Sequence, residues 1–100
     1  MKMKLYVSLP ISGRKLDEAK KSAELVKSRW QSDNIEVVTP FDVTGESEDY
    51  NYCMGKCIET LLGCTGIILC NGWQHSKGCN SEYAVAMIYG KKIYNEADKV

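Results

Sequence analysis

The sequence predicts an α/β domain built on a parallel sheet with helices on both faces. Three observations lead to this prediction. Short apolar segments with strand character alternate with longer segments whose apolar residues recur every three or four positions. One short segment, 67–70, is apolar at consecutive positions, which is typical of a strand buried on both faces. Proline or glycine stands at most of the junctions, as expected where one element ends and the next begins.

The alternation extends over the whole chain and predicts a single domain at 1–100. We expect strands at 5–9, 35–39, 67–70 and 92–94, separated by helices at 16–30, 50–62 and 79–89. Right-handed crossovers then favour a three-layer, doubly wound sheet (flavodoxin- or Rossmann-like) of about four strands in the order 2-1-3-4. In that order the loops 10–14 and 71–78 meet over one crevice between strands one and three. Open α/β sheets bind ligands at such a point, so we expect the site there.

Each element follows from its residues. The first two strands are rich in β-branched and aromatic residues, and Pro10 and Pro40 close them. The first helix has an apolar stripe that Leu25 is expected to widen, formed by Leu16, Ala19, Ala23, Val26 and Trp30. The polar, acidic segment 41–49 is expected to be a loop. The second helix repeats the pattern through Tyr50, Met54, Cys57, Ile58, Leu61 and Leu62, and Gly63 ends it. We expect residues 95–100 to form a polar tail or the remnant of a further element.

Composition excludes several classes of function. The chain has 100 residues with 13 basic and 13 acidic side chains, so no electrostatic footprint indicates nucleic acid or an anionic membrane surface. The apolar stretch near the N-terminus is too short for a signal peptide, and no segment approaches the length of a membrane span. We therefore expect a cytoplasmic protein.

The five cysteines are odd in number and include no Cys-x-x-Cys pair, which favours reduced, buried thiols. A zinc site would have to combine Cys53, Cys57, His75 and Cys79, a spacing that matches no structural zinc pattern. We expect neither a metal nor another cofactor.

Glu82 is the candidate on which a catalytic function depends. It falls in the first turn of the predicted third helix, beside the crevice at the carboxyl end of a central strand. A second interpretation stays open, because acids in a first turn are favoured by the helix dipole alone. A capping box would need Ser or Thr three residues earlier, where Cys79 stands, so the simplest capping explanation is weakened.

Two short segments are candidates for binding a phosphate or sugar. Ser76-Lys77-Gly78 precedes the third helix and combines helix-terminal amides with a hydroxyl and an ammonium. Ser12-Gly13-Arg14 opens the first helix beside the same crevice. Neither segment is a P-loop or a Gly-x-Gly-x-x-Gly fingerprint, and either is also compatible with an ordinary polar turn.

Aromatic residues and the single histidine leave alternatives open. Trp73 is able to stack on a base or to anchor its loop by packing, and Tyr6 to point into the core or into the crevice. His75 is the only histidine, and no motif around it supports a catalytic triad.

The chain resembles the nucleoside 2-deoxyribosyltransferase superfamily, and within it a small branch of uncharacterised domains of about this length. The resemblance covers nearly the whole chain. It is carried by Leu5-Tyr6-Val7-Ser8-Leu9-Pro10-Ile11-Ser12-Gly13, Thr39-Pro40-Phe41-Asp42, the segment 64–69, Gly72-Trp73-x-x-Ser76-x-Gly78-x-x-x-Glu82 and Ala86-x-x-x-Gly90. The superfamily also contains the 2′-deoxynucleoside 5′-phosphate N-hydrolases.

The resemblance implies specific roles. The residue matching Glu82 is the nucleophile that attacks the anomeric carbon of deoxyribose, forms a covalent glycosyl-enzyme and is released by a second base or by water. Ser76 matches a serine that contacts the 5′-phosphate in the N-hydrolases, and Tyr6 matches a tyrosine of the same pocket, where its hydroxyl is able to orient the glutamate. On this analogy a nucleoside monophosphate fits better than a free nucleoside, and a homodimer or larger homo-oligomer is expected.

The chain departs from the superfamily at two positions where relatives commonly carry aspartate. These positions are Cys57 and Thr65, and a cysteine cannot replace a carboxyl group as general acid for the leaving base. Asp49 and Glu59 are nearby acids but do not match the position. The sequence therefore leaves two hypotheses: an N-glycosidic enzyme using Glu82, or a nucleotide-binding or sensor domain that kept the pocket and lost the acid. It does not specify the base, the sugar, or transfer against hydrolysis.

Overall fold

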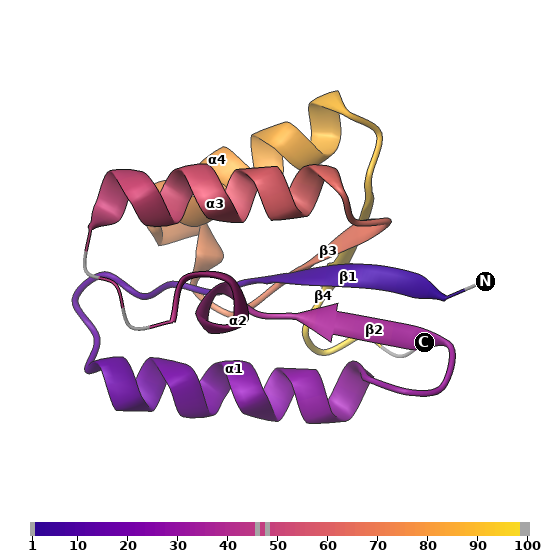
Figure 1. Ribbon diagram of the computed structural model, residues 1–100, viewed down its shortest axis with the longest axis horizontal. Coiled ribbons are helices and arrows are strands. Elements are labelled where there is room, and N and C mark those ends of the chain that lie inside the picture. The colour runs from indigo at the N-terminus through magenta and orange to yellow at the C-terminus, as the bar shows by residue number, and fades with distance from the viewer. Residues whose placement is uncertain (1, 46, 48, 99–100) are drawn as a thin grey trace.

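A computed structural model describes residues 2–45, 47 and 49–98 of the chain. Four parallel strands form one sheet in the order β2-β1-β3-β4, as the sequence predicted (Figure 1). The strands are β1 (Met3–Ser8), β2 (Ile35–Val38), β3 (Gly66–Leu69) and β4 (Lys92–Asn95). In the register between β1 and β3, Leu5 pairs with Gly66 and Ser8 with Leu69, so these two strands end together beside the loops that follow them.

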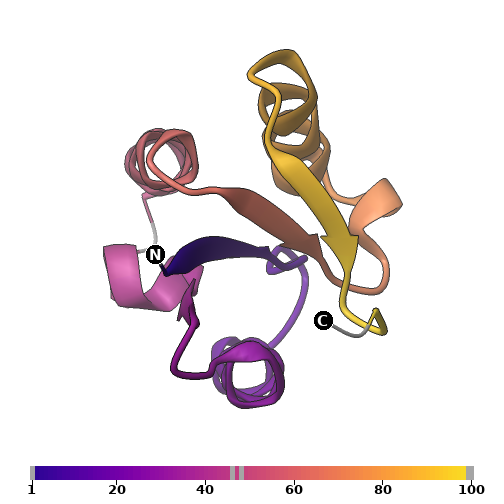
Figure 2. The same ribbon diagram turned by 90° about the vertical axis from the view of Figure 1, so that its right-hand side faces the viewer.

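Helices cover both faces of the sheet (Figure 2). Helix α1 (Leu16–Trp30) lies on one face, while α3 (Tyr50–Leu62) and α4 (Lys77–Ile88) lie side by side on the other. This confirms the three-layer arrangement. Within the described part of the chain, no helix is long and apolar enough to cross a membrane.

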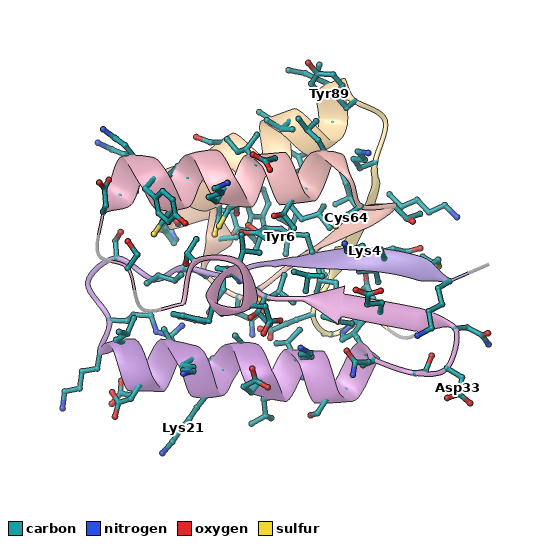
Figure 3. The ribbon with its side chains drawn as sticks, in the orientation of Figure 1. Lys4, Tyr6, Lys21, Asp33, Cys64 and Tyr89 are labelled. Carbon is teal, nitrogen blue, oxygen red and sulfur yellow. The ribbon has the colours of Figure 1, made fainter. Side chains whose placement is uncertain are left out.

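The sheet separates two apolar clusters because alternate strand residues point to opposite faces. Leu5, Val7 and Ile68 pack under α1, in a cluster completed by residues such as Ala23 and Trp30. The opposite cluster contains Tyr6, Ile67 and Leu69 with Cys57, Leu61 and Ala86 from α3 and α4. Figure 3 shows Tyr6 on the α3 side of β1. Tyr6 therefore faces the same side of the sheet as Glu82.

The structure corrects two expectations about these elements. Leu25 is 60% exposed and does not belong to the buried stripe of α1. Trp30, by contrast, is buried as the predicted stripe requires, and it packs against Tyr94. The segment expected to be a loop begins with a short helix, α2 (Pro40–Thr44), and a further 3₁₀ turn, η1 (Trp73–His75), lies in the loop after β3.

Helix α2 begins at Pro40 because its first turn carries a complete set of start signals. Thr39 is the N-cap, its hydroxyl accepts from the Asp42 amide, and the Asp42 carboxylate accepts from the Thr39 amide. Proline at the first helical position costs nothing, because its missing amide proton would have no intrahelical partner there. The pattern Thr-Pro-x-Asp was visible in the sequence, but five residues are too few for a helical apolar period.

Helix α4 begins two residues earlier than expected. Ser76 is its N-cap and accepts a hydrogen bond from the Cys79 amide. Glu82 therefore lies in the second turn, and its first-turn placement was wrong. The helix dipole is strongest within the first turn, so it does not account for a carboxylate at this position.

Strand β4 approaches β3 so closely at Gly66 that we expect no larger residue to fit there. A β-carbon there would lie 2.7 Å from the Lys92 carbonyl oxygen and 3.1 Å from Cδ2 of Leu5. Gly66→Ala should therefore lower the free energy of unfolding by about 2 kcal/mol, measured by urea denaturation. Gly55→Ala is the matched control, because a β-carbon on this α3 residue meets no atom within 4 Å. It should raise stability by up to about 1 kcal/mol, since alanine favours helix over glycine. Equal effects at the two sites would contradict the packing argument.

Candidate active site

Glu82 is a buried carboxylate held by two hydroxyl groups from the central strand β1. Its side chain is 5% exposed. The Tyr6 hydroxyl donates to Oε2 and the Ser8 hydroxyl to Oε1, each at 2.7 Å. Tyr6 and Ser8 are two residues apart on one strand, so both point to the face covered by α4. The two hydrogen bonds fix the orientation of the carboxylate.

Burial changes the protonation of this cluster. It raises the pKa of Glu82 to about 7, while the Ser8 and Tyr6 hydroxyls act in the opposite direction. Burial, assisted by the proximity of Glu82, raises the pKa of Tyr6 well above its usual value, so the phenol stays a hydrogen-bond donor. A carboxyl group whose pKa lies near neutrality is suited to exchange between charged and neutral forms during a reaction.

A cavity of about 470 Å³ opens in front of Glu82. It lies beyond the carboxyl ends of the strands, and its lining includes Tyr6 and Glu82. The walls come from the loop after β1, from α2 and the segment after it, from one face of α3 and from the start of α4. The volume falls within the range of small-molecule sites, about 300–1,000 Å³. The crevice expected between strands one and three is thus a pocket large enough for a nucleotide-sized ligand.

The segment 12–14 lines the cavity, as does the start of α4. Ser12, Gly13 and Arg14 are all in the wall. The Arg14 guanidinium donates to the Pro10 carbonyl at 3.2 Å and to the Ser22 hydroxyl at 2.8 Å, which holds it along its own loop and helix. Arg14 is the only basic residue among the described residues that line the cavity.

The residues of the predicted binding segment 76–78 divide between two hollows. Ser76 and Gly78 line the cavity. They also line a neighbouring hollow of about 490 Å³, which includes Lys77 and His75. Trp73 lines neither hollow and packs on Tyr83, with ring centroids 4.8 Å apart. The structure therefore brings Tyr6, Glu82, 12–14, Ser76 and Gly78 together, with Lys77 at the margin and Trp73 outside.

A thiol rather than a carboxyl group lines the cavity at position 57. Cys57 lines the cavity beside Tyr6, and burial raises its pKa to about 11 although the Tyr6 hydroxyl acts in the opposite direction. Asp49 is the N-cap of α3 and accepts from the Tyr52 amide, and Glu59 is exposed and faces Lys56. Among the described residues that line the cavity, Glu82 is the only acidic one.

Thr65 lies away from the site. It precedes β3, at the amino end of the sheet, and its hydroxyl accepts from the Lys4 amide at 3.3 Å. In the described part of the chain, no three His, Cys, Asp or Glu side chains are placed to hold a metal ion.

Ser8 is the functional candidate that sequence reasoning missed. It is fully buried, and its hydroxyl is one of the two partners of Glu82. One signal was available: Ser8 is the polar residue of an otherwise apolar strand and stands two positions after Tyr6, on the same face. A buried hydroxyl needs a hydrogen-bond partner, and for Ser8 that partner is Glu82 of the helix packed on this face.

A solved structure, "2-desoxiribosyltransferase from Leishmania mexicana", has the same fold, with a TM-score of 0.72 at 16% sequence identity. The match covers 93% of this chain and 63% of that one, so this chain spans less than two thirds of its length. None of the curated proteins matches the sequence. Residues 3–95, from the start of β1 to the end of β4, match the family described as "Domain of unknown function (DUF4406)". The chain belongs to this DUF4406 family.

Proposed function

We propose that this chain cleaves or transfers the N-glycosidic bond of 2′-deoxynucleosides or of their 5′-monophosphates, with Glu82 as the nucleophile. The observation that carries the proposal is a buried carboxylate fixed by the hydroxyls of Tyr6 and Ser8 and lining a cavity of suitable size. The shared fold with a 2-desoxiribosyltransferase supports the same reaction class. A carboxylate in a water-poor pocket is able to stabilise the oxocarbenium-like centre through which such bonds break.

The reaction proceeds in two balanced steps. A Glu82 oxygen bonds to the anomeric carbon of the sugar, and the electron pair of the glycosidic bond leaves with the base, which takes a proton from solvent. In hydrolysis, water then attacks the anomeric carbon and loses a proton to solvent, the ester bond to Glu82 breaks, and the carboxylate is restored. In transfer, a second base replaces water. Both routes are those of a retaining glycosidase.

A nucleoside 5′-monophosphate is the substrate class that the polar end of the cavity favours. The Ser76 hydroxyl accepts from the Cys79 amide, and a hydroxyl that accepts in this way is still able to donate its own proton to a phosphate oxygen. Ser12, Gly13 and Arg14 also line the cavity, and the first amides of α4 carry partial positive charge. The apolar lining, including Phe41 and Met54, is left for the base and sugar.

A second candidate function is binding of a nucleotide without turnover. The observation that favours it is the cavity's lining: Cys57, with its raised pKa, is not an acid that is able to protonate a leaving base near neutral pH. On this alternative the protein is a nucleotide sensor that kept the pocket and lost the general acid.

One experiment separates the two functions. The protein is incubated with each 2′-deoxynucleoside and each 5′-monophosphate, and free base is measured by chromatography while the melting temperature is recorded. Release of base supports the enzyme, and a rise in melting temperature without release supports the sensor. If none of these compounds releases base or raises the melting temperature, both functions are contradicted.

Tyr6→Phe is expected to lower kcat/KM for base release by about 10- to 100-fold, because it removes one hydrogen bond to a charged group. The phenyl ring retains the packing of Tyr6 in its buried cluster. Tyr83→Phe is the matched control, because Tyr83 packs on Trp73 and does not line the cavity. Removal of the Tyr83 hydroxyl should leave the rate unchanged. A full rate in Tyr6→Phe would show that this hydroxyl does not assist Glu82.

We also propose that the chain assembles as a homodimer or larger homo-oligomer. The support is a run of exposed apolar side chains at the end of α4, Met87, Ile88 and Tyr89, of which Ile88 is 77% exposed. Light scattering measures the mass directly, and a monomer at all concentrations would contradict this proposal.

A further inference from the structure

The two oxygens of Glu82 have different surroundings. Oε2 is held by Tyr6, which lines the cavity together with Glu82. Oε1 is held by Ser8, which is fully buried and is not part of the cavity lining. Ser8 therefore contacts the carboxylate from behind, on the side away from the ligand space.

We propose that Ser8 is a positioning residue that anchors Oε1 of Glu82, so that Oε2 is the oxygen presented to the ligand. This inference rests on the proposed function for its catalytic consequence. Its structural content does not: a carboxylate bonded by one hydroxyl is free to turn about its terminal bond, whereas two donors from one rigid strand fix its plane.

The anchor has a role in both steps of the proposed reaction. When Oε2 bonds to the anomeric carbon, Oε1 becomes the carbonyl oxygen of the ester and still accepts from Ser8. When that ester breaks, negative charge returns to the carboxylate and the Ser8 hydrogen bond stabilises it. Tyr6 cannot have the same role at Oε2, because the incoming sugar competes with its hydroxyl for that oxygen.

Among the described residues, few titratable or hydrogen-bonding groups face Glu82, so its titration is a usable readout. They are Tyr6 of β1, Cys57 of α3 and Cys79 of its own helix, together with Ser8. Burial raises the pKa of both thiols and of the phenol, so all three stay neutral while Glu82 titrates. A change in the Glu82 midpoint on removal of Ser8 then reports the hydrogen bond.

The test compares the full-length chain with Ser8→Ala and Ser8→Cys. Carboxyl carbons are labelled with ¹³C-glutamate, the Glu82 resonance is identified by its absence in Glu82→Gln, and its midpoint is followed by NMR. Ser8→Ala should raise this midpoint by about one pH unit, because it removes a hydrogen bond to the charged form. Ser8→Cys keeps the volume with a weak donor and should give a smaller rise. It also serves as the second variant should Ser8→Ala not fold.

Activity gives the second readout. The acid limb of kcat/KM against pH should move upward with the NMR midpoint, and kcat should fall about tenfold with little change in KM. Ser28→Ala is the matched control, because this exposed α1 hydroxyl bonds only the Leu25 carbonyl among the described contacts. It should change neither readout.

The outcomes separate this inference from the proposed function. A Glu82 midpoint that is unchanged in both Ser8 variants would overturn the anchoring role, whatever the activity. A shifted midpoint in a protein that releases no base would leave the anchor established and contradict only its catalytic use. A fall in kcat without a shifted midpoint would also overturn the inference, since Ser8 would then act elsewhere.

Discussion

Replacing Glu82 with glutamine is expected to abolish base release, with a fall in kcat of at least about 10³-fold. Glutamine has nearly the same shape and is able to keep contacts with Tyr6 and Ser8, but its amide is not a nucleophile. The side chain is buried and lines the cavity, so no other described acid is placed to replace it. The measurement is initial rates of free-base formation at saturating deoxynucleoside monophosphate.

The matched control is Glu59→Gln, the same substitution at an exposed α3 residue that faces Lys56. It should retain the full rate. Binding is measured in parallel, because Glu82→Gln should still show a ligand-dependent rise in melting temperature. A Glu82→Gln protein that releases base at the rate of the unmodified chain would exclude Glu82 as nucleophile.

Covalent catalysis adds a direct observation. A substrate whose sugar carries an electron-withdrawing 2′-fluorine slows both steps, and the glycosyl-enzyme should then accumulate. Intact-mass spectrometry should show the added sugar on the unmodified chain and none on Glu82→Gln. Peptide mapping should place it on the peptide that contains Glu82. An adduct on a cavity thiol such as Cys53 would instead assign the nucleophile to sulfur.

The fold was predictable because its signals are periodic and repeated. Short apolar strand segments and helices of period 3.6 alternate along the chain, which restricts the topology to a few parallel arrangements. Helix α2 escaped this reasoning because it is short, so only the capping residues Thr39 and Asp42 identify it. Leu25 was wrongly assigned to the buried stripe of α1. The stripe is narrower than expected, and Leu25 lies outside it although the adjacent Val26 is buried.

The site was predictable only to the level of which residues share the crevice. Parallel strands end at one edge, so the loops 10–14 and 71–78 were expected to meet there, whereas the direction of Tyr6 was left open by its strand position. The observed start of α4 lies two residues before the expected one, so Glu82 is in the second turn of the helix. From there its carboxylate contacts Ser8. Such a contact depends on how one helix is rotated against the sheet, which no local pattern in this sequence specifies.

The pH dependence of stability is expected to show the energetic consequence of burying Glu82. The folded-state pKa of about 7 lies above the ordinary value of 4.5, so between these values the folded chain binds the proton more tightly than the unfolded chain does. Stability should therefore be highest below about pH 4.5 as far as Glu82 is concerned, fall as pH rises, and level off above about pH 7. The total loss of stability is about 3 kcal/mol, the free-energy equivalent of a pKa that moves from 4.5 to about 7.

Glu82→Gln removes this dependence, because glutamine stays neutral. Its free energy of unfolding should exceed that of the unmodified chain by about 3 kcal/mol at pH 8 and equal it near pH 4.5, measured by urea denaturation across that range. Asp42 contributes in the opposite sense at lower pH. Partial burial acts to raise its pKa, but the Thr39 amide and Lys27 hold the carboxylate and lower the pKa overall. Because Asp42 is present in both proteins, its contribution cancels in the comparison. Parallel stability curves from pH 5 to 8 would show that Glu82 is not buried as a charge. The expected result would mean that the ionised form required for attack is the form that destabilises the fold, and that Tyr6 and Ser8 offset part of this cost.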